Sequence, residues 1–301
     1  MSIPEVASAL SLGLASHVAQ SIHELARLAA HTLPASSPAW RLAQKRVVRP
    51  IDYMRHAEFT AVLHDLEISP GSRVLDVSSP QWFSIYLAST HPTASFVYIN
   101  IIESELEPYR EIAQALRLDN LEHRIGDVRE LEFQDASFDR AISISVIEHV
   151  YPEVGGDSAA LDEIERVLVP GGECLITIPF KNESNVVRVD GAVYERGAEK
   201  DNFFAREYDQ RTFSSLVDGC NLSLEGTWII SEQVGAGAVD FYEWGPGKRA
   251  RLHSAMIRSR ILLQALGRSV DGALARRYLR VSREPQGRLV NIAARLRKAS
   301  A

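Results

Sequence analysis

Short apolar runs alternate with longer amphipathic stretches between residues 73 and 178, and this alternation restricts the possible folds more than any other feature. Strands that alternate with helices of ten to fifteen residues form βαβ units, in which the strands lie parallel. We therefore predict an α/β fold with a doubly wound, mostly parallel seven-stranded sheet, in which runs 222–230 and 238–243 complete the set. The strand-like runs of the alternating region are 73–77, 95–99, 122–125, 140–144 and 173–178.

Amphipathic segments flank this region on both sides. Apolar residues recur at steps of three and four from Val6 to Ala29, which predicts one long helix ending before Pro34. A second helix is expected over 53–66. The domain prediction is an N-terminal helical arm over 1–52, a sheet domain over 53–245 and a basic helical C-terminal extension over 246–301.

The formal net charge of −6 is a cancellation between these parts. Residues 246–301 contain fourteen Lys and Arg and two acids, whereas residues 1–245 contain 19 bases and 37 acids. A basic helix can dock on the acidic body, on a second subunit or on an anionic surface such as a membrane or an acidic substrate. With Tyr278 as its one aromatic residue, the segment does not favour nucleic acid. Homo-oligomerisation through the helical arms also stays open.

Two features indicate a cytoplasmic protein. No apolar run approaches the roughly 18 residues of a membrane span, and no Lys or Arg precedes Arg27. Cys174 and Cys220 lack the spacing of a metal site, and we interpret them as reduced thiols. No metal site is predicted.

Polar residues follow four of the predicted strands, and these residues are the candidates for holding a cofactor. Asp76, Asn100 and Asp127 stand at or after the ends of the first three runs, and Ser143–Ser145 ends the fourth. Ligands of open α/β sheets bind beyond the carboxyl ends of the strands. Asn100 follows Asp76 by 24 positions, near the roughly 20 expected for a ribose-contacting residue.

Residues from about 55 to 245 resemble the class I, Rossmann-like S-adenosylmethionine-dependent methyltransferases. The resemblance is carried by Gly126-Asp127, by SFDRAISISVIEHV over 137–150 and by RVLVPGGECLITIPF over 166–180. The segment NFFAREYD over 202–209 is also similar to segments of some members. The resemblance implies S-adenosylmethionine as cofactor and a small or medium-sized molecule as methyl acceptor.

The resemblance also implies roles for particular residues. Asp76 would organise the first loop near the amino-acid end of the cofactor, together with Ser78 and Ser79. Asn100 would hold the ribose hydroxyls. Asp127 and the Val128 amide would face the adenine, and the backbone from Ser143 to Ser145 would line the methionine portion.

The first loop departs from the family pattern of an acid followed by three alternate glycines. Ser78, Pro80 and Trp82 stand at those three places. Glycine permits positive φ, serine can follow at some cost, and proline is locked near −65° without an N–H. Ser78-x-x-Gln81 has the form of a capping box that would start the next helix. Trp82 is either a core residue or a wall of the cofactor pocket.

Asn100 is a second departure, since the family usually has an acid there. Hydrogen bonds to a charged acceptor contribute about 1.5–3 kcal/mol, against about 0.5–1.5 for neutral pairs. Asn100 would thus weaken cofactor binding by about 1 kcal/mol. On this basis Asn100→Asp is expected to tighten binding if the side chain faces the ribose.

His149, with Glu148 beside it, is the best-placed general base, because it lies just past the fourth strand on the side where an acceptor would approach. The alternative is a histidine that packs beneath the cofactor loop. An acceptor-binding cap is expected from the segment that holds Tyr194, Phe203, Phe204, Arg206 and Tyr208, with Arg206 facing an anionic group of the acceptor. The alternative is a lid that only packs.

Two functions follow from these patterns. The first is methyl transfer from S-adenosylmethionine to an O, N or C acceptor. The second is a methyltransferase-like protein that lacks methyl transfer and acts as a binding or scaffolding subunit, which the departures at Ser78, Pro80, Trp82 and Asn100 favour.

Overall fold

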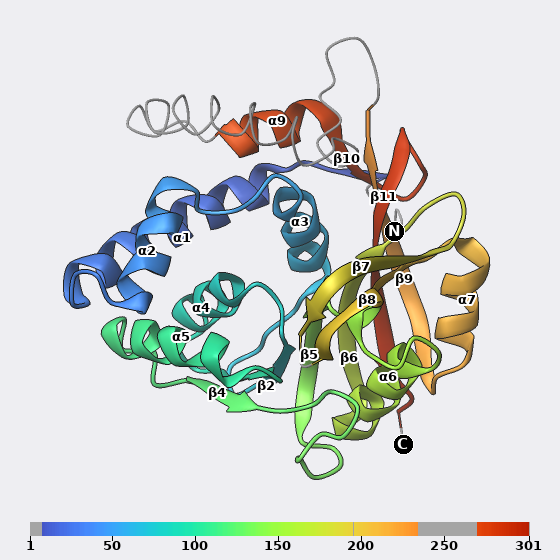
Figure 1. Cartoon of the computed structure of the whole chain (residues 1–301), viewed down its shortest axis with the longest axis horizontal. Helices are drawn as coiled ribbons and strands as arrows, with labels where there is room; N and C mark the ends of the chain where they lie inside the picture. Colours follow the sequence, from blue (N-terminus) through green and yellow to red (C-terminus); the bar gives the residue numbers. More distant parts are fainter. Residues whose placement is uncertain (1–7, 195, 234–269, 301) are drawn as a thin grey trace, which may run out of the picture.

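In a computed structural model, which describes residues 8–194, 196–233 and 270–300, one large sheet is covered by helices on both faces (Figure 1). The order of its strands places β2 between β3 and β5, so the chain reverses its direction of travel across the sheet at β2. The open α/β fold is confirmed. In order across the sheet, the strands are β1 (Ala9–Leu10), β10 (Leu279–Ser282), β9 (Leu222–Glu232), β11 (Arg288–Lys298), β6 (Leu168–Pro179), β5 (Phe138–Ile144), β2 (Arg73–Val77), β3 (Ser95–Asn100) and β4 (Leu121–Ile125).

The sheet has a parallel half and an antiparallel half. Strands β6, β5, β2, β3 and β4 pair in parallel, whereas β11, β9, β10 and β1 pair antiparallel to their neighbours. Nine strands thus lie in the described part of the sheet, against the seven predicted. The predicted strand at 238–243 lies outside the described residues.

Each face of the sheet has its own apolar core. One core joins α1 and α2 with α4, α5 and strand residues such as Val74 and Phe96. The other joins α6 and α7 with residues such as Leu75 and Ile176. Successive strand residues therefore face opposite cores, as the pleat requires. The helices are α1 (Gly13–Thr32), α2 (Pro38–Val48), α3 (Arg55–Asp65), α4 (Gln81–Thr90), α5 (Glu103–Ala115), the 3₁₀ helix η1 (Ile147–His149), α6 (Gly156–Val167), α7 (Gln210–Asp218) and α9 (Val270–Tyr278).

The predicted N-terminal helix is present as α1, but it begins at Gly13 and not near Val6, because Ala9–Leu10 form a strand. Its buried stripe, which includes Val18, Ile22 and Ala26, packs into the core beside the sheet. Residues Ala9–Leu10 add a short strand to the sheet edge by pairing with β10. The N-terminal segment is therefore built into the fold.

The predicted helical C-terminal extension is wrong for residues 279–298, which form β10 and β11. Strand β11 lies between β9 and β6 and pairs with both (Figure 1). Alanine, leucine and arginine are good helix formers, but pairing on both edges overrides that preference. The apolar stripe expected at 252–266 lies outside the described residues.

Three cations of the described C-terminal segment pair with acids that precede this segment in the chain. Arg288 contacts Glu232, Arg297 contacts Glu173, and Lys298 lies 3.2 Å from Glu165. Docking on the acidic body therefore accounts for these three charges.

A two-stranded hairpin, β7 (Asn185–Val193) with β8 (Arg196–Glu207), stands apart from the sheet. It follows β6 and precedes α7, so it lies beside the carboxyl ends of the parallel strands (Figure 1). Among the helices that the structure describes, none has both the length and the apolar character needed to cross a bilayer.

Candidate active site

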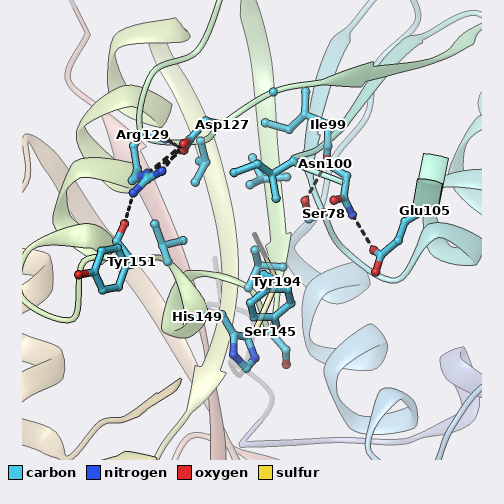
Figure 2. A pocket seen from close by; sticks show the side chains of 16 residues that line it. Ser78, Ile99, Asn100, Glu105, Asp127, Arg129, Ser145, His149, Tyr151 and Tyr194 are labelled. Carbon is cyan, nitrogen blue, oxygen red and sulfur yellow. Dashed lines mark hydrogen bonds and ion pairs between the residues drawn. The ribbon is translucent and has the colours of Figure 1, made fainter. Parts of the chain in front are cut away.

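A pocket opens at the carboxyl ends of β2, β3, β4 and β5, where the strand order reverses (Figure 2). It encloses about 790 Å³ of space, which includes its open mouth. Three polar groups lie at separate places on its wall: Asn100 with Glu105, Asp127 with Arg129, and Ser145 with His149 (Figure 2). The lining residues are Val77, Ser78, Ile99, Asn100, Ile101, Glu105, Gly126, Asp127, Val128, Arg129, Ser145, Val146, His149, Val150, Tyr151 and Tyr194.

Ser78 takes the conformation for which glycine is usually needed. Its φ is +52°, and both its N–H and its hydroxyl donate to the Ile99 carbonyl, at 3.0 and 2.8 Å. These two bonds offset the cost of the left-handed region for a residue with a Cβ. The serine therefore preserves the turn that opens the pocket.

Asp76 lies beneath this loop and does not line the pocket. Its carboxylate accepts from the Ser79 N–H at 3.0 Å and from the Ser84 hydroxyl at 2.5 Å. Burial raises the pKa of Asp76 to about 6, although hydrogen bonds from Ser84 and Ser79 oppose this rise. Asp76 thus braces the first loop from below.

Ser79 and Ser143 are also buried and contact the backbone, away from the pocket. The Ser79 hydroxyl accepts from the Ile144 N–H at 3.0 Å, and its carbonyl accepts from the Tyr98 hydroxyl at 3.0 Å. Ser143 is fully buried, with its hydroxyl 3.5 Å from the Val77 carbonyl. Both serines tie β2 to its neighbours.

The capping box predicted at Ser78 and Gln81 is wrong. Helix α4 begins at Gln81 after Pro80, and no side chain caps it. The Gln81 amide instead donates to the backbone carbonyl of Glu105 at 3.0 Å, which ties α4 to α5. Trp82 is 3% exposed and belongs to the core. It is therefore a core residue and not a wall of the pocket.

At the end of β3, Asn100 contacts Glu105 of α5 (Figure 2). The Asn100 oxygen accepts from the Ile102 N–H at 2.8 Å, and its amide nitrogen donates to Glu105 Oε2 at 3.2 Å. Glu105 was not among the site residues predicted from the sequence. The feature that could have indicated it is an acid in the first turn of the helix that follows the strand.

At the end of β4, Asp127 pairs with Arg129. The Arg129 backbone N–H and Nε both donate to Asp127 Oδ1 at 2.9 Å, and Arg129 also donates to the Tyr151 carbonyl at 2.6 Å. Hydrogen bonding from Arg129 lowers the pKa of Asp127. Asp127 and the mostly buried Val128 both line the pocket.

A buried carboxylate that sequence analysis missed supports the end of β5. Glu58 of α3 is fully buried, and its Oε1 accepts from Ser145 at 2.5 Å, Thr177 at 2.9 Å and Asn291 at 2.9 Å. Arg55 pairs with the other oxygen at 2.6 Å. The sequence signal was an acid within the apolar stretch 56–62. Because of these contacts, α3 and β11 both support Ser145 in the pocket wall.

His149 lines the pocket in a defined tautomer. Its Nδ1 lies 2.7 Å from the Phe204 carbonyl, which can only accept, so Nδ1 carries a proton and Nε2 has a free lone pair in the neutral ring. Burial lowers the pKa of His149 and favours that neutral form. The ring packs edge-on against Tyr194 and Phe204. His149 thus brings a neutral imidazole with an unprotonated Nε2 to the pocket.

Glu148 lies behind His149, with Oε1 3.8 Å from His149 Nε2. The carboxyl is 2% exposed, and burial together with the nearby Glu58 raises its pKa to about 8. Glu148 does not line the pocket, so it can act only through His149.

Glu148→Gln should make the protein more stable at pH 8.5 but not at pH 5. The wild-type carboxyl stays neutral in the folded chain up to about pH 8, whereas it ionises near 4.5 in the unfolded chain. The folded state then binds more protons in that window, so stability falls as pH rises. The glutamine variant lacks this pH-dependent loss of stability. Its free energy of unfolding at pH 8.5 should therefore exceed that of the wild type by roughly 1 kcal/mol or more. Urea unfolding of both proteins at the two pH values measures this, and an equal difference at both would contradict it.

The tip of the hairpin forms part of the pocket wall. Tyr194 at its tip is 47% exposed and lines the pocket, while Phe204 packs behind His149. Phe203 and Tyr208 are buried, and the Tyr208 hydroxyl donates to Asp157 at 2.8 Å.

Arg206 docks the hairpin and does not face the pocket. Its guanidinium donates to the carbonyls of Glu148, Val150, Pro152 and Glu153 and lies 3.3 Å from Asp157. The expectation that Arg206 binds an anionic acceptor group is wrong, because these contacts use the donors of the side chain.

The comparisons with known proteins agree with this geometry. A family model described as a methyltransferase domain matches residues 68–213. A glycine/sarcosine/dimethylglycine N-methyltransferase of Actinopolyspora halophila is 32% identical over 136 residues, which are 44% of this chain and 23% of that protein. An arsenite methyltransferase of Halobacterium salinarum is 28% identical over 123 residues, 38% of this chain and 30% of that protein. The matches thus span less than a third of either relative.

A solved structure supports the fold. The crystal structure of an S-adenosylmethionine-dependent methyltransferase from Methanosarcina mazei has a TM-score of 0.50 at 15% identity and covers 80% of this chain and 98% of that one. Residues 68–213 of the chain therefore match a methyltransferase domain.

Proposed function

We propose that this protein binds S-adenosylmethionine in the pocket and transfers its methyl group to a small acceptor that enters beside the β7–β8 hairpin. The observation that carries the proposal is the arrangement of the pocket wall, which combines three separate polar groups with apolar surface. The relatives named above, which act on amines or arsenite by their names, support methyl transfer without specifying the acceptor here.

The residues present fit the cofactor. Ile99, Ile101 and Val128 offer apolar surface for a purine, and Asp127 lies beside them. Asn100 and Glu105 offer hydrogen-bonding groups for a ribose. The positive φ of Ser78 keeps the first loop open despite the missing glycines.

Bound S-adenosylmethionine supplies a methyl group already activated on a sulfonium. The protein then needs to position the acceptor, exclude water and take up a proton where the acceptor has one to lose. His149 Nε2 can receive that proton, and the Phe204 carbonyl, which lies 2.7 Å from Nδ1, favours the protonated ring. Tyr194 and Phe204 shield this end of the pocket from water.

We extend the proposal to the setting of the protein. Both cysteines are free thiols, which supports a reducing, cytoplasmic compartment. Leu14 and Leu28 are exposed on α1 and support an oligomer through the N-terminal helices. Arg288, Arg297 and Lys298 pair with acids of the same chain, so these three cations do not support a contact with an anionic surface.

The test is titration calorimetry of the purified protein with S-adenosylmethionine and S-adenosylhomocysteine. We expect saturable binding at micromolar ligand, and no heat up to millimolar ligand would contradict the proposal. Ile101→Trp, which adds bulk to an exposed residue of the wall, should abolish binding without altering the fold.

A second measurement separates the enzyme from a binding subunit. Protein, methyl-labelled cofactor and a protein-free metabolite extract should yield a labelled small molecule. Tight binding without any labelled product from extracts that support a known methyltransferase would favour the scaffolding function instead.

A further inference from the structure

The carboxylate that the strand end lacks is present five residues later, on α5. We propose that Glu105 is the residue that accepts hydrogen bonds from the ribose hydroxyls of the cofactor, and that Asn100 is a positioning residue for Glu105. The inference rests on the proposed function, because it assigns a ligand group to the same pocket.

The contacts of Asn100 determine how its amide is oriented. Its oxygen faces the Ile102 N–H at 2.8 Å and its nitrogen faces Glu105 Oε2 at 3.2 Å. A flipped amide would set an N–H against an N–H and an oxygen against a carboxylate. Asn100 is therefore a donor toward Glu105, and it is not itself a replacement for the missing acid.

Glu105 is the acid of the pocket wall that keeps its charge available. Asp127, the other acid of the wall, is engaged by Arg129. Two neighbours on α5, Glu103 and Glu107, pair with Arg110. Glu105 forms no ion pair with any residue in the described ranges, and its carboxylate lies at the pocket wall beside Asn100 (Figure 2).

A side chain of α4 holds the backbone of Glu105 in place. Gln81, at the start of α4, donates to the Glu105 carbonyl at 3.0 Å. The Asn100 amide then orients the side chain. A carboxylate so placed can accept from two adjacent hydroxyls at once, and such charge-assisted bonds are stronger than neutral ones.

This arrangement reverses the expectation for Asn100→Asp. The new carboxylate would keep the bond from Ile102, and its second oxygen would face Glu105 Oε2 across about 3.2 Å. Two like charges at that separation repel, so one must take up a proton or move away. We now expect Asn100→Asp to weaken cofactor binding.

The test is the affinity of the purified full-length chain for S-adenosylhomocysteine and for its analogue that lacks both ribose hydroxyls. Glu105→Gln should weaken binding of S-adenosylhomocysteine by about tenfold to a hundredfold and leave binding of the analogue nearly unchanged. Glu103→Gln is the matched control, since it removes an acid from the same helical turn outside the pocket, and it should change neither affinity.

The exchange Asn100→Asp with Glu105→Gln provides a rescue. It restores one acid and one amide, so its affinity should return toward the wild-type value, above that of Asn100→Asp alone. Unchanged affinity in Glu105→Gln, or an equal loss for both ligands, would overturn the assignment. Wild-type protein that binds neither ligand would overturn the proposed function itself.

Discussion

A chain that ends at Gly287 should not fold: we expect it to give no cooperative unfolding transition and no binding of S-adenosylhomocysteine. The deletion removes β11, which lies in the interior of the sheet between β9 and β6. Both neighbours would then expose an unpaired edge, and the antiparallel half of the sheet would lose its connection to the parallel half.

The size of the loss supports this expectation. Val290, Ile292 and Leu296 are at most 3% exposed, and burial of such side chains contributes about 1.5–3 kcal/mol each. Their sum of roughly 5–9 kcal/mol is already comparable to the whole stability of a typical domain, about 5–15 kcal/mol. Loss of Asn291 would also remove one of the hydrogen-bond donors to the buried Glu58 carboxylate.

Circular dichroism during thermal unfolding measures the outcome. A chain that ends at Ala299 is the control, because it keeps β11 and should unfold cooperatively. If the chain ending at Gly287 unfolded cooperatively and bound the ligand, the described C-terminus would be an appendage, as sequence analysis predicted.

Replacement of His149 should have the largest effect on activity. We expect His149→Asn to lower the rate of methyl transfer by about a hundredfold or more for an acceptor that must lose a proton, since a positioned base contributes about 10²–10⁴. Affinity for S-adenosylhomocysteine should stay within about threefold, because asparagine can still donate to the Phe204 carbonyl. Initial rates with labelled cofactor, together with calorimetry, measure both quantities.

The pH profile tests the same role. Burial lowers the pKa of His149, so the wild-type rate should fall only at acid pH, below the usual range for histidine, as Nε2 becomes protonated. The variant should lack this acid limb. His64→Asn, which replaces a more exposed histidine next to Asp65, is the control. A His149 variant that loses affinity and rate in equal measure would indicate a packing role instead.

The candidate site could be predicted where its residues follow the ends of the parallel strands. Asn100, Asp127, Ser145 and His149 line the pocket because parallel strands place their carboxyl ends at one edge, which the sequence pattern already implies. Asp76, Ser79 and Ser143 stand in the same segments, yet they face the interior. Whether a side chain at a strand end faces the pocket or the interior depends on the geometry of the turn after the strand. Sequence periodicity does not specify that geometry.

Glu58 and Asn291 mark the limit of prediction from sequence. They are 233 positions apart and meet beneath Ser145. Each is one polar residue in an apolar stretch, and only packing of α3 against β11 makes them partners. Arg206 is the converse case, since its residue type suggested an anion site but nearby carbonyl groups already accept its hydrogen bonds.

The sequence by itself determined the alternation of strands and helices, the long N-terminal helix and the polar residues at the strand ends, because periodicity and turn chemistry are local properties. The tertiary structure decided that the basic C-terminus supplies an inner strand, that Ser78 can take positive φ, and that the Glu105 carboxylate lies beside Asn100 at the pocket wall. Each of these features depends on hydrogen bonds between segments distant in sequence or on a specific turn geometry. The local sequence pattern specifies neither the long-range hydrogen bonds nor the turn geometry.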